Sequence, residues 1–393
     1  MRKILTLNKI SPKGLDLFPR DSYEVASEFL APDAIVLRSF KMHDMELPSS
    51  LKAIARAGAG TNNIPIDKCT EQGIVVFNTP GANANAVKEL VLTGMLLASR
   101  DVVGGVEWVQ SIADKGDEVS KVVEKGKSNF AGNELKGKKL GVVGLGAIGA
   151  MVANTALELG MEVVGYDPYL SVDAAWELSS EVEKATGLET LLGEVDYISI
   201  HIPLLDSTKN IFNAEKFAMM RDGIKIMNFA RGGLVEENDL KEALKSGKVS
   251  CYVTDFPNAN ILGVKGIIPI PHLGASTAES EENCATMAVN QVKDYLENGN
   301  IRNSVNFPNC VLPRGVCEHR ITIKNRNVPN IIGEISTTLA KNSINICDML
   351  NKSKNDIAFN IIDLDGELSD AVIAEIEAID GVIAVRVVSL TCL

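Results

Sequence analysis

The stretch that most constrains the fold of this chain runs from Lys138 to Pro168. It opens with a short apolar run, turns through Gly144-Leu145-Gly146-Ala147-Ile148-Gly149, continues as a helical pattern and ends in a second apolar run at Asp167. A strand, a glycine turn, a helix, a second strand and then an acid, roughly 20 residues after the turn, is the arrangement that binds a dinucleotide. The alternative is a buried βαβ unit with incidental glycines, which the matched context disfavours.

Each glycine of this turn has a physical reason. Gly144 permits the tight turn, Gly146 lets the backbone approach a pyrophosphate, and Gly149 lets the helix pack closely on the strand. The start of the helix offers free N–H groups and a partial positive charge to the phosphates. The carboxylate of Asp167 can accept hydrogen bonds from ribose hydroxyls and would repel a 2′-phosphate, so the sequence predicts NAD as the cofactor and not NADP.

The net charge, the length of the apolar stretches and the spacing of the cysteines disfavour nucleic-acid-binding, membrane, secreted and metal-binding proteins. The net charge of -12 and the pI near 5.0 disfavour a nucleic acid or an anionic membrane as partner. The longest apolar stretch, 90–98, is too short to span a membrane, and the N-terminus lacks the apolar segment of a signal peptide, so we expect a cytoplasmic protein. The seven cysteines form no CxxC pair, which predicts reduced thiols and no metal site.

Strand and helix patterns alternate on both sides of the glycine turn. Short apolar runs occur in residues 1–100 and again after Asp167, with helical patterns between them. This order predicts an α/β fold with two doubly wound parallel sheets. Ligands of such sheets lie beyond the carboxyl ends of the strands. The loops that follow the early strands, 38–39, 58–63 and 78–83, should therefore line one crevice.

The C-terminal part follows a different pattern. Residues 320–393 are predicted to form β-α-β-β-α-β, with the last strand at 382–389, which is the split ferredoxin-like arrangement. A unit of roughly 75 residues has a marginal core alone, so we expect it to dock or to pair with a second copy. The preceding segment, 301–317, carries two prolines and little periodicity, as expected of a linker.

Two polar side chains beyond the glycine turn suit oxidation of a 2-hydroxy acid. This reaction needs a cation for the carboxylate, a base with a pKa near neutrality and a hydride acceptor. Arg231, at a strand end, offers the guanidinium, and His272 offers the base. Taken alone, each is more often a solvated loop residue, but together with the glycine turn they favour a catalytic interpretation. His43 and His319 are interpreted as loop residues, and His201 as a packing residue near the cofactor.

With these motifs the chain resembles the D-isomer-specific 2-hydroxyacid dehydrogenases, and within them the branch that acts on 3-phosphoglycerate. The matching segments are 144–149 with 166–168, 228–233, 271–277, 36–39, 55–64 and 77–90. The resemblance implies four parts: a flavodoxin-like substrate domain at 1–98 and 285–310, a Rossmann NAD domain at 99–284, a linker at 311–319, and a regulatory ACT domain of ferredoxin-like fold at 320–393.

The resemblance also implies an activity and site residues. The activity is NAD-dependent oxidation of 3-phospho-D-glycerate to 3-phosphohydroxypyruvate, the first committed step of L-serine synthesis, with Arg231 on the carboxylate and His272 moving the proton. The cofactor residues are Gly144, Gly146, Ala147, Ile148, Gly149, Tyr166, Asp167, Pro168, His201, Ile202, Pro203, Thr208, Ala230, Asp255, Gly274 and Ala275. The substrate residues are Arg38, Ser39, Arg56, Ala59, Gly60 and Asn83.

The chain departs from the family pattern at one position and leaves its tail open to two interpretations. The family usually has a Glu that hydrogen-bonds the catalytic His, but Ala259 stands at that place. In the tail, Asn325, Asn327 and Asn345 match places at which serine-inhibited relatives bind L-serine between paired ACT domains. The alternative is an ACT-like dimerisation unit without a ligand. Either way, we expect a homodimer or homotetramer.

Two other functions stay open on the sequence. One is a dehydrogenase of another D-2-hydroxy acid, of the lactate or glyoxylate type, against which Arg38, Arg56 and the tail argue. The other is an NAD-sensing binding protein without catalysis, against which the joint presence of Arg231 and His272 argues.

Overall fold

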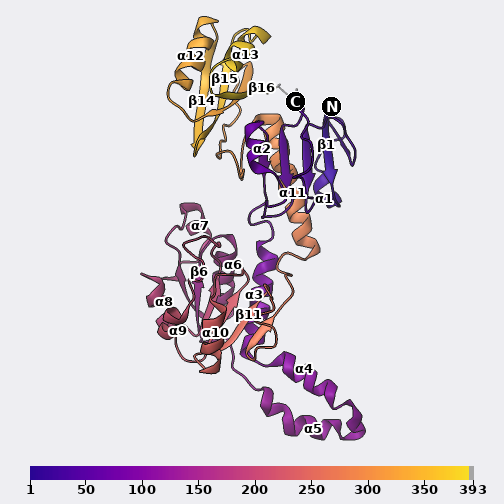
Figure 1. The fold of residues 1–393 in the computed structure, drawn as a ribbon, viewed down its shortest axis with the longest axis vertical. Coiled ribbons are helices and arrows are strands. Elements are labelled where there is room, and N and C mark those ends of the chain that lie inside the picture. The colour runs from indigo at the N-terminus through magenta and orange to yellow at the C-terminus, as the bar shows by residue number, and fades with distance from the viewer. Residues whose placement is uncertain (389–393) are drawn as a thin grey trace. The chain divides into compact units, whose positions relative to one another are not determined.

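The chain forms two compact units, each of which contains a parallel sheet (Figure 1). One unit comprises residues 1–82 and 278–393, and the other comprises residues 83–277. The computed structural model describes residues 1–388, apart from the side chain of residue 173. Across these described residues, no helix combines the length and the apolar character needed to cross a membrane.

The first unit contains a five-stranded parallel sheet in the order β2-β1-β3-β4-β5. Its strands are β1 (Arg2–Leu7), β2 (Tyr23–Ala26), β3 (Ala34–Leu37), β4 (Ala53–Arg56) and β5 (Val75–Phe77). The strands β3 and β5 are buried throughout because alternate side chains enter two different apolar cores. The long helix α11 (Ala278–Asn298) belongs to one core and α2 (Ile66–Glu71) to the other, while the short α1 (Pro12–Leu15) packs on α11.

The same unit carries a four-stranded antiparallel sheet in the order β14-β15-β13-β16. Its elements follow one another as β13 (His319–Arg326), α12 (Ile331–Lys341), β14 (Asn345–Lys354), β15 (Ile357–Asp365), α13 (Asp370–Glu377) and β16 (Val382–Val388). This is the predicted β-α-β-β-α-β order, except that residue 389 of the expected last strand lies outside the described residues.

A buried arginine joins this antiparallel sheet to the preceding segment of its unit. Arg320 in β13 donates from Nε and Nη2 to the two carboxylate oxygens of Asp363 in β15, at 2.6 and 2.7 Å. Its Nη1 donates to the carbonyl oxygens of Asn298 and Leu312, at 3.0 and 2.9 Å. Because Arg320 is only 1% exposed, these bonds satisfy a charge that water does not reach.

The second unit contains a seven-stranded parallel sheet in the order β12-β11-β10-β9-β6-β7-β8. Its strands are β6 (Lys139–Val143), β7 (Glu162–Tyr166), β8 (Glu183–Lys184), β9 (Tyr197–Ile200), β10 (Ile224–Asn228), β11 (Val249–Thr254) and β12 (Ile267–Pro269). Its α-helices are α3 (Ala84–Ser99), α4 (Val102–Ser111), α5 (Val119–Gly126), α6 (Ala147–Glu158), α7 (Val172–Glu177), α8 (Leu188–Glu194), α9 (Ala214–Met219) and α10 (Glu237–Lys245), and its short 3-10 helices are η1 (Ala113–Glu118) and η2 (Lys127–Phe130).

The helix α3 lies in the second unit. The predicted substrate domain, which ends at residue 98, includes almost all of this helix. Its buried side chains Val87, Val91 and Met95 share a core with the strands of the seven-stranded sheet, and it packs on α6. A Cβ on its Gly94 would come within 3.0 Å of the ring of Phe229, so the helix sits very close to the sheet. The domain limits at 98/99 and 284/285 stay a prediction beside the division at 82/83 and 277/278.

The predicted α/β class with parallel sheets is confirmed for both units. All pairings in the two larger sheets are parallel, and all pairings in the C-terminal sheet are antiparallel. In the second unit this arrangement brings the carboxyl ends of seven strands to one edge, which is where the candidate site lies.

Candidate functional site

The glycine turn has the geometry that its spacing predicts. Gly144 directly follows β6 and has a φ of +93°, a conformation that favours glycine. A Cβ on Gly149 would lie 1.9 Å from the carbonyl oxygen of Gly144, so only glycine allows α6 to start so close to the strand. A Cβ on Gly146 would meet nothing within 4 Å. The backbone at Gly146, which caps α6, is therefore open to an approaching pyrophosphate.

Asp167 directly follows β7 and holds the glycine turn in place. Its Oδ2 accepts from the backbone N–H of Leu145 at 2.9 Å, and its Oδ1 accepts from the backbone N–H of Tyr169 at 2.8 Å. A carboxylate has about four lone-pair sites, so these bonds leave capacity for ribose hydroxyls. Tyr166 is the last residue of β7, and Pro168, which follows that strand, is exposed. Ala147, the first residue of α6, is also exposed.

His201 follows β9 and is held as a neutral ring. Its Nε2 lies 2.8 Å from the hydroxyl of Ser199. Loss of solvent lowers the pKa of His201 to about 4, which agrees with a packing role and disfavours proton transfer. The next loop is closed by Thr208, whose hydroxyl donates to the carbonyl oxygen of Pro203 at 2.6 Å and accepts from the N–H of Leu205 at 2.8 Å.

Arg231 sits in a turn that Asn228 builds. The side-chain amide of Asn228, the last residue of β10, donates to the carbonyl oxygen of Arg231 at 2.9 Å and accepts from the N–H of Ala230 at 3.2 Å. It also donates to the hydroxyl of Tyr252, which is in β11, at 3.0 Å. The guanidinium of Arg231 is exposed and bonds within this turn only to the carbonyl oxygen of Ala230, at 2.7 Å. It is thus available to a carboxylate.

His272 contacts an aromatic ring. The rings of His272 and Phe256 have centroids 4.8 Å apart at an interplanar angle of 54°. Phe256 also packs beside the Arg231 turn, because a Cβ on Gly232 would lie 3.5 Å from its Cβ. Ala259, at the place of the usual Glu, is exposed. The sequence does not reveal the role of Phe256, since nothing in its pattern distinguishes it from an ordinary core residue.

Asp255 follows β11, the strand that lies between the strands before the Arg231 and His272 loops. It is 1% exposed, and its Oδ1 has no hydrogen-bond partner among the described residues. Burial raises the pKa of Asp255, while the nearby His272, the N–H of Gly274 and Arg231 oppose that rise. A buried acceptor without a partner suits a ligand that brings an N–H donor, such as the carboxamide of nicotinamide. The residues present therefore fit an NAD molecule along this edge.

The strand order arranges these residues in one row. His272, Asp255, Arg231, His201, Gly144 and Asp167 follow the neighbouring strands β12, β11, β10, β9, β6 and β7. Gly274 and Ala275 belong to the loop of His272, and Ile202 and Pro203 to that of His201. The sheet therefore brings all the predicted catalytic residues and most of the predicted cofactor residues to a single edge.

The predicted substrate residues of the first unit form a second group at strand ends. Arg38, at the end of β3, makes a 2.5 Å ion pair with Glu281 of α11. Arg56, at the end of β4, donates from Nε to the carbonyl oxygen of Arg38 at 2.9 Å and also bonds to the carbonyl oxygen of Gly60. Burial, and then the charge of Arg38, lower the pKa of Arg56. Arg56 therefore links two loops, and Arg38 carries the more available guanidinium.

Two of the remaining predicted substrate residues, Ser39 and Ala59, make hydrogen bonds through their backbone. The N–H of Ser39 donates to Oδ1 of Asn8 at 3.1 Å, and the carbonyl oxygen of Ala59 accepts from the side chain of Asn78 at 2.6 Å. Asn83 is the N-cap residue of α3, and its side chain makes no cap hydrogen bond. Glu281 is the residue that the sequence missed here, and the charge run at the start of α11 was its only signal.

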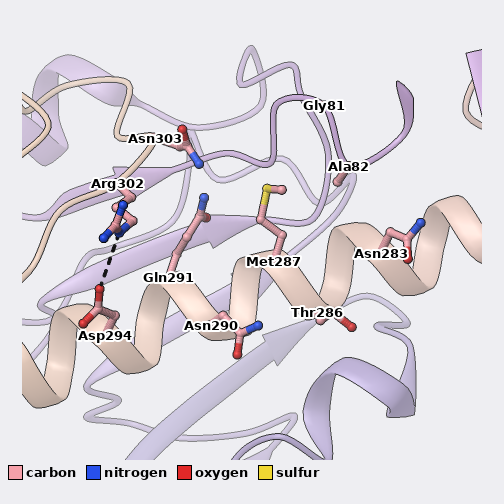
Figure 2. Close-up of a pocket in the computed structure, with 10 residues that line it drawn as sticks. All are labelled: Gly81, Ala82, Asn283, Thr286, Met287, Asn290, Gln291, Asp294, Arg302 and Asn303. Atoms are coloured by element: carbon pink, nitrogen blue, oxygen red, sulfur yellow. Dashed lines mark ion pairs between the residues drawn. The ribbon is translucent and has the colours of Figure 1, made fainter. Parts of the chain in front are cut away.

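The first unit contains a cavity of about 640 Å³. It is lined by α11 and by the segments 81–82 and 302–303 (Figure 2). Arg302 and Asp294 form a 4.0 Å ion pair at its wall. None of the predicted substrate residues lines this cavity, although the segment 81–82 belongs to a loop that the sequence predicts at the crevice.

The three asparagines predicted to bind an effector do not come together in one chain. Asn325 is buried and its Oδ1 accepts from Asn360 at 2.8 Å, whereas Asn327 and Asn345 are exposed. Asn325 pairs with Ala358 and Asn345 with Asp365 along β15. Seven residues of strand separate these pairings, roughly 23 Å. A site that contains both asparagines would need a second copy of the chain.

Comparison with known proteins identifies the second unit. The family model described as the NAD binding domain of the D-isomer specific 2-hydroxyacid dehydrogenases matches residues 93–274. These residues form an NAD-binding domain of that family, and the NAD prediction is confirmed.

Curated relatives match a longer part of the chain than the family model does. The chain is 31% identical over 354 residues to the D-3-phosphoglycerate dehydrogenase of Haemophilus influenzae, covering 87% of this chain and 82% of the relative. It is 37% identical to the hydroxypyruvate reductase of Thermotoga maritima, covering 70% and 92%. The D-3-phosphoglycerate dehydrogenase of Methanocaldococcus jannaschii is 36% identical over 73% of this chain, but the chain spans only 54% of that relative.

A solved structure agrees with these relatives. The NAD⁺-bound 3-phosphoglycerate dehydrogenase of Entamoeba histolytica superposes with a TM-score of 0.57 at 26% identity, covering 78% of this chain and 98% of the other. The chain therefore belongs to the family of D-isomer-specific 2-hydroxyacid dehydrogenases.

Proposed function

We propose that this protein oxidises 3-phospho-D-glycerate to 3-phosphohydroxypyruvate with NAD, the first committed step of L-serine synthesis. The observation that carries the proposal is the row formed by Arg231, Asp255 and His272 at the ends of three neighbouring strands of the NAD-binding unit. A cation, a buried acceptor and an imidazole in that order match a carboxylate, a nicotinamide carboxamide and a hydroxyl proton.

Each of these residues has one role in the proposed reaction. Arg231 binds the substrate carboxylate through its exposed guanidinium and thereby fixes the orientation of the substrate. His272 accepts the proton of the C2 hydroxyl, and the ring of Phe256 holds His272 in place. Asp255 accepts from the cofactor through its free Oδ1. NAD, when bound, supplies the acceptor for the hydride that leaves C2.

The proposed contact for the substrate phosphate is Arg38. Its partner Glu281 is a surface carboxylate with 49% of its side chain exposed, and a phosphate dianion can replace it. Arg56 supports this contact by holding the carbonyl oxygens of Arg38 and Gly60. The ion pair predicts that Arg38→Ala weakens binding of a phosphorylated substrate more than that of an unphosphorylated one.

A second candidate function is reduction of an unphosphorylated 2-oxo acid, and the similarity to the hydroxypyruvate reductase of Thermotoga maritima favours it. An NAD-sensing protein without catalysis is a third. Absorbance at the NADH band distinguishes the three functions. The proposal expects turnover with 3-phosphoglycerate and phosphohydroxypyruvate far above that with D-lactate or glyoxylate, the second candidate expects the reverse, and the third expects binding of NADH without turnover.

For the C-terminal part we propose an ACT domain at 320–393, joined by a linker at 311–319 to a substrate domain formed by 1–98 and 285–310, with the NAD domain at 99–284. Its element order and antiparallel sheet support this assignment. L-serine as effector would need two copies, because Asn325 and Asn345 lie at opposite ends of β15. Calorimetric titration of the full chain with L-serine, against Asn345→Ala, tests this; absence of heat in both would leave only dimerisation.

We further propose a homodimer or homotetramer. On α4 the side chains of Val102, Val103, Val106 and Val109 are each at least 41% exposed. A row of exposed valines on one helix is a feature of interaction surfaces. Sedimentation equilibrium of the wild type and of Val106→Asp tests the assembly, and a monomeric wild type would contradict it.

A further inference from the structure

Three groups that can bind a metal ion meet at one end of the antiparallel sheet. They are the thiols of Cys317 and Cys347 and the carboxylate of Asp365, whose ligand atoms all lie within 4.8 Å of one another. Cys317 precedes β13, Cys347 is in β14 and Asp365 ends β15. Cys347 and Asp365 are exposed and Cys317 is half-buried, so an ion in solution can reach all three.

The local backbone explains how these groups come together. The register of β14 on β15 shifts between Ile346 and Asp348, which leaves Cys347 without a partner in β15. Such a bulge re-aims a side chain at the edge of a sheet. The carboxylate of Asp365 is fixed by the N–H of Glu318, which donates to its Oδ1 at 3.1 Å. In turn, the N–H of Gly366 donates to the carboxylate of Glu318 at 3.1 Å.

The composition of the group favours a cation over a disulfide. A disulfide would use only the two thiols, whereas the carboxylate of Asp365 lies within 4.8 Å of both sulfur atoms. A divalent cation binds two thiolates and a carboxylate together and compensates their charge.

We propose that Cys317, Cys347 and Asp365 form a binding site for a thiophilic divalent cation, of which Zn²⁺ fits best. Tetrahedral zinc takes thiolates at about 2.3 Å and carboxylate oxygens at about 2.0–2.2 Å, which places neighbouring ligand atoms roughly 3.3–3.8 Å apart. The three groups need to close by only about 1 Å to reach this geometry. Water from the solvent completes the coordination. The bound ion ties the segment before β13 to β14 and β15.

Titration of the reduced full-length protein with Co²⁺ tests the proposal, because thiolate ligation gives a charge-transfer band in the near ultraviolet. We expect one Co²⁺ per chain with this band, which Cys317→Ser and Cys347→Ser abolish. Asp365→Asn should weaken the binding and keep the band. The matched control is Cys69→Ala, which removes a buried thiol from another part of the same unit and should change nothing.

Two results would overturn the proposal. One is a wild-type protein, fully reduced, that gives no thiolate band with Co²⁺. The other is a band of equal strength in Cys347→Ser. As a second readout, Zn²⁺ should raise the Tm of the wild type and leave that of Cys347→Ser unchanged. This readout separates loss of the site from a folding defect, because Cys347→Ser without Zn²⁺ should melt like the wild type.

Discussion

The carboxyl edge of the seven-stranded sheet and the end of the antiparallel sheet both collect polar side chains, but they do so by different means. In the parallel sheet every strand ends at the same edge, so residues as far apart as Gly144 and His272 are brought into one row. In the antiparallel sheet neighbouring strands end at opposite edges. There, Cys317, Cys347 and Asp365 meet only because of a bulge and a segment before the first strand.

The largest expected effect concerns the proposed base. His272→Asn should lower kcat by roughly 10²–10⁴-fold, because the C2 hydroxyl loses its proton acceptor. Steady-state kinetics with 3-phosphoglycerate and NAD measure it, and NADH binding, followed by fluorescence, should persist. His43→Asn is the matched control in the first unit. Equal loss of activity in both variants would contradict the assignment.

The next effect concerns the antiparallel sheet and its buried ion pair. Arg320→Met leaves the carboxylate of Asp363 buried without its partner and should cost roughly 3–5 kcal/mol of unfolding free energy. Chemical denaturation measures this loss. The double variant Arg320→Met with Asp363→Leu should recover most of it, since no uncompensated charge remains. A single variant that is as stable as the wild type would show that the pair contributes little.

Two glycine substitutions test the glycine turn at the carboxyl edge of the seven-stranded sheet. Gly149→Ala forces a Cβ to within 1.9 Å of a carbonyl oxygen and should destabilise the NAD-binding unit. Gly146→Ala meets nothing within 4 Å, so the Tm should stay near that of the wild type while the affinity for NAD falls. Thermal melts with and without NAD test both. Unchanged NAD affinity in Gly146→Ala would argue against pyrophosphate at this turn.

The pH dependence of stability provides a test of His201. Its pKa is about 4 in the folded chain and ordinarily 6.5. As the pH falls below about 6.5, the unfolded chain takes up a proton that the folded chain refuses until about 4, so His201 lowers stability across this window. The Tm of His201→Asn should therefore fall less than that of the wild type on acidification. If the Tm of the two proteins fell equally with pH, the ring of His201 would be hydrated in the folded chain.

The smallest expected effect concerns Phe256. Phe256→Leu keeps an apolar side chain but removes the ring that contacts His272, so we expect a decrease in kcat/KM of about 10-fold or less. Because Phe256 acts through His272, the limb of the kcat/KM–pH profile that reports the base should also shift, and Phe256→Tyr should restore it. The matched control is Phe229→Leu, in the core of the same unit. A loss of activity without a shift of that limb would indicate a merely structural role.

The sequence predicted the elements of the parallel sheets and the residues at their edge, because local patterns and strand ends determine both. It could not predict the ring contact of Phe256, the ion pair of Arg38 with Glu281 or the cluster around Cys347. These depend on side chains brought together by tertiary packing, and the whole of β13 and α12 separates the two thiols along the chain. The prediction of reduced thiols without a metal site followed from the spacing of the cysteines alone. That spacing does not reveal the β-bulge at Cys347.

The central claim is that the edge carrying Arg231, Asp255 and His272 supports transfer of a hydride from C2 of 3-phosphoglycerate to NAD. Mass spectrometry of the cofactor after turnover with 3-phosphoglycerate deuterated at C2 tests it most directly. We predict that each NADH formed carries the deuterium in its nicotinamide ring and that Arg231→Gln forms little product. An absence of labelled NADH from the wild-type protein would contradict the account.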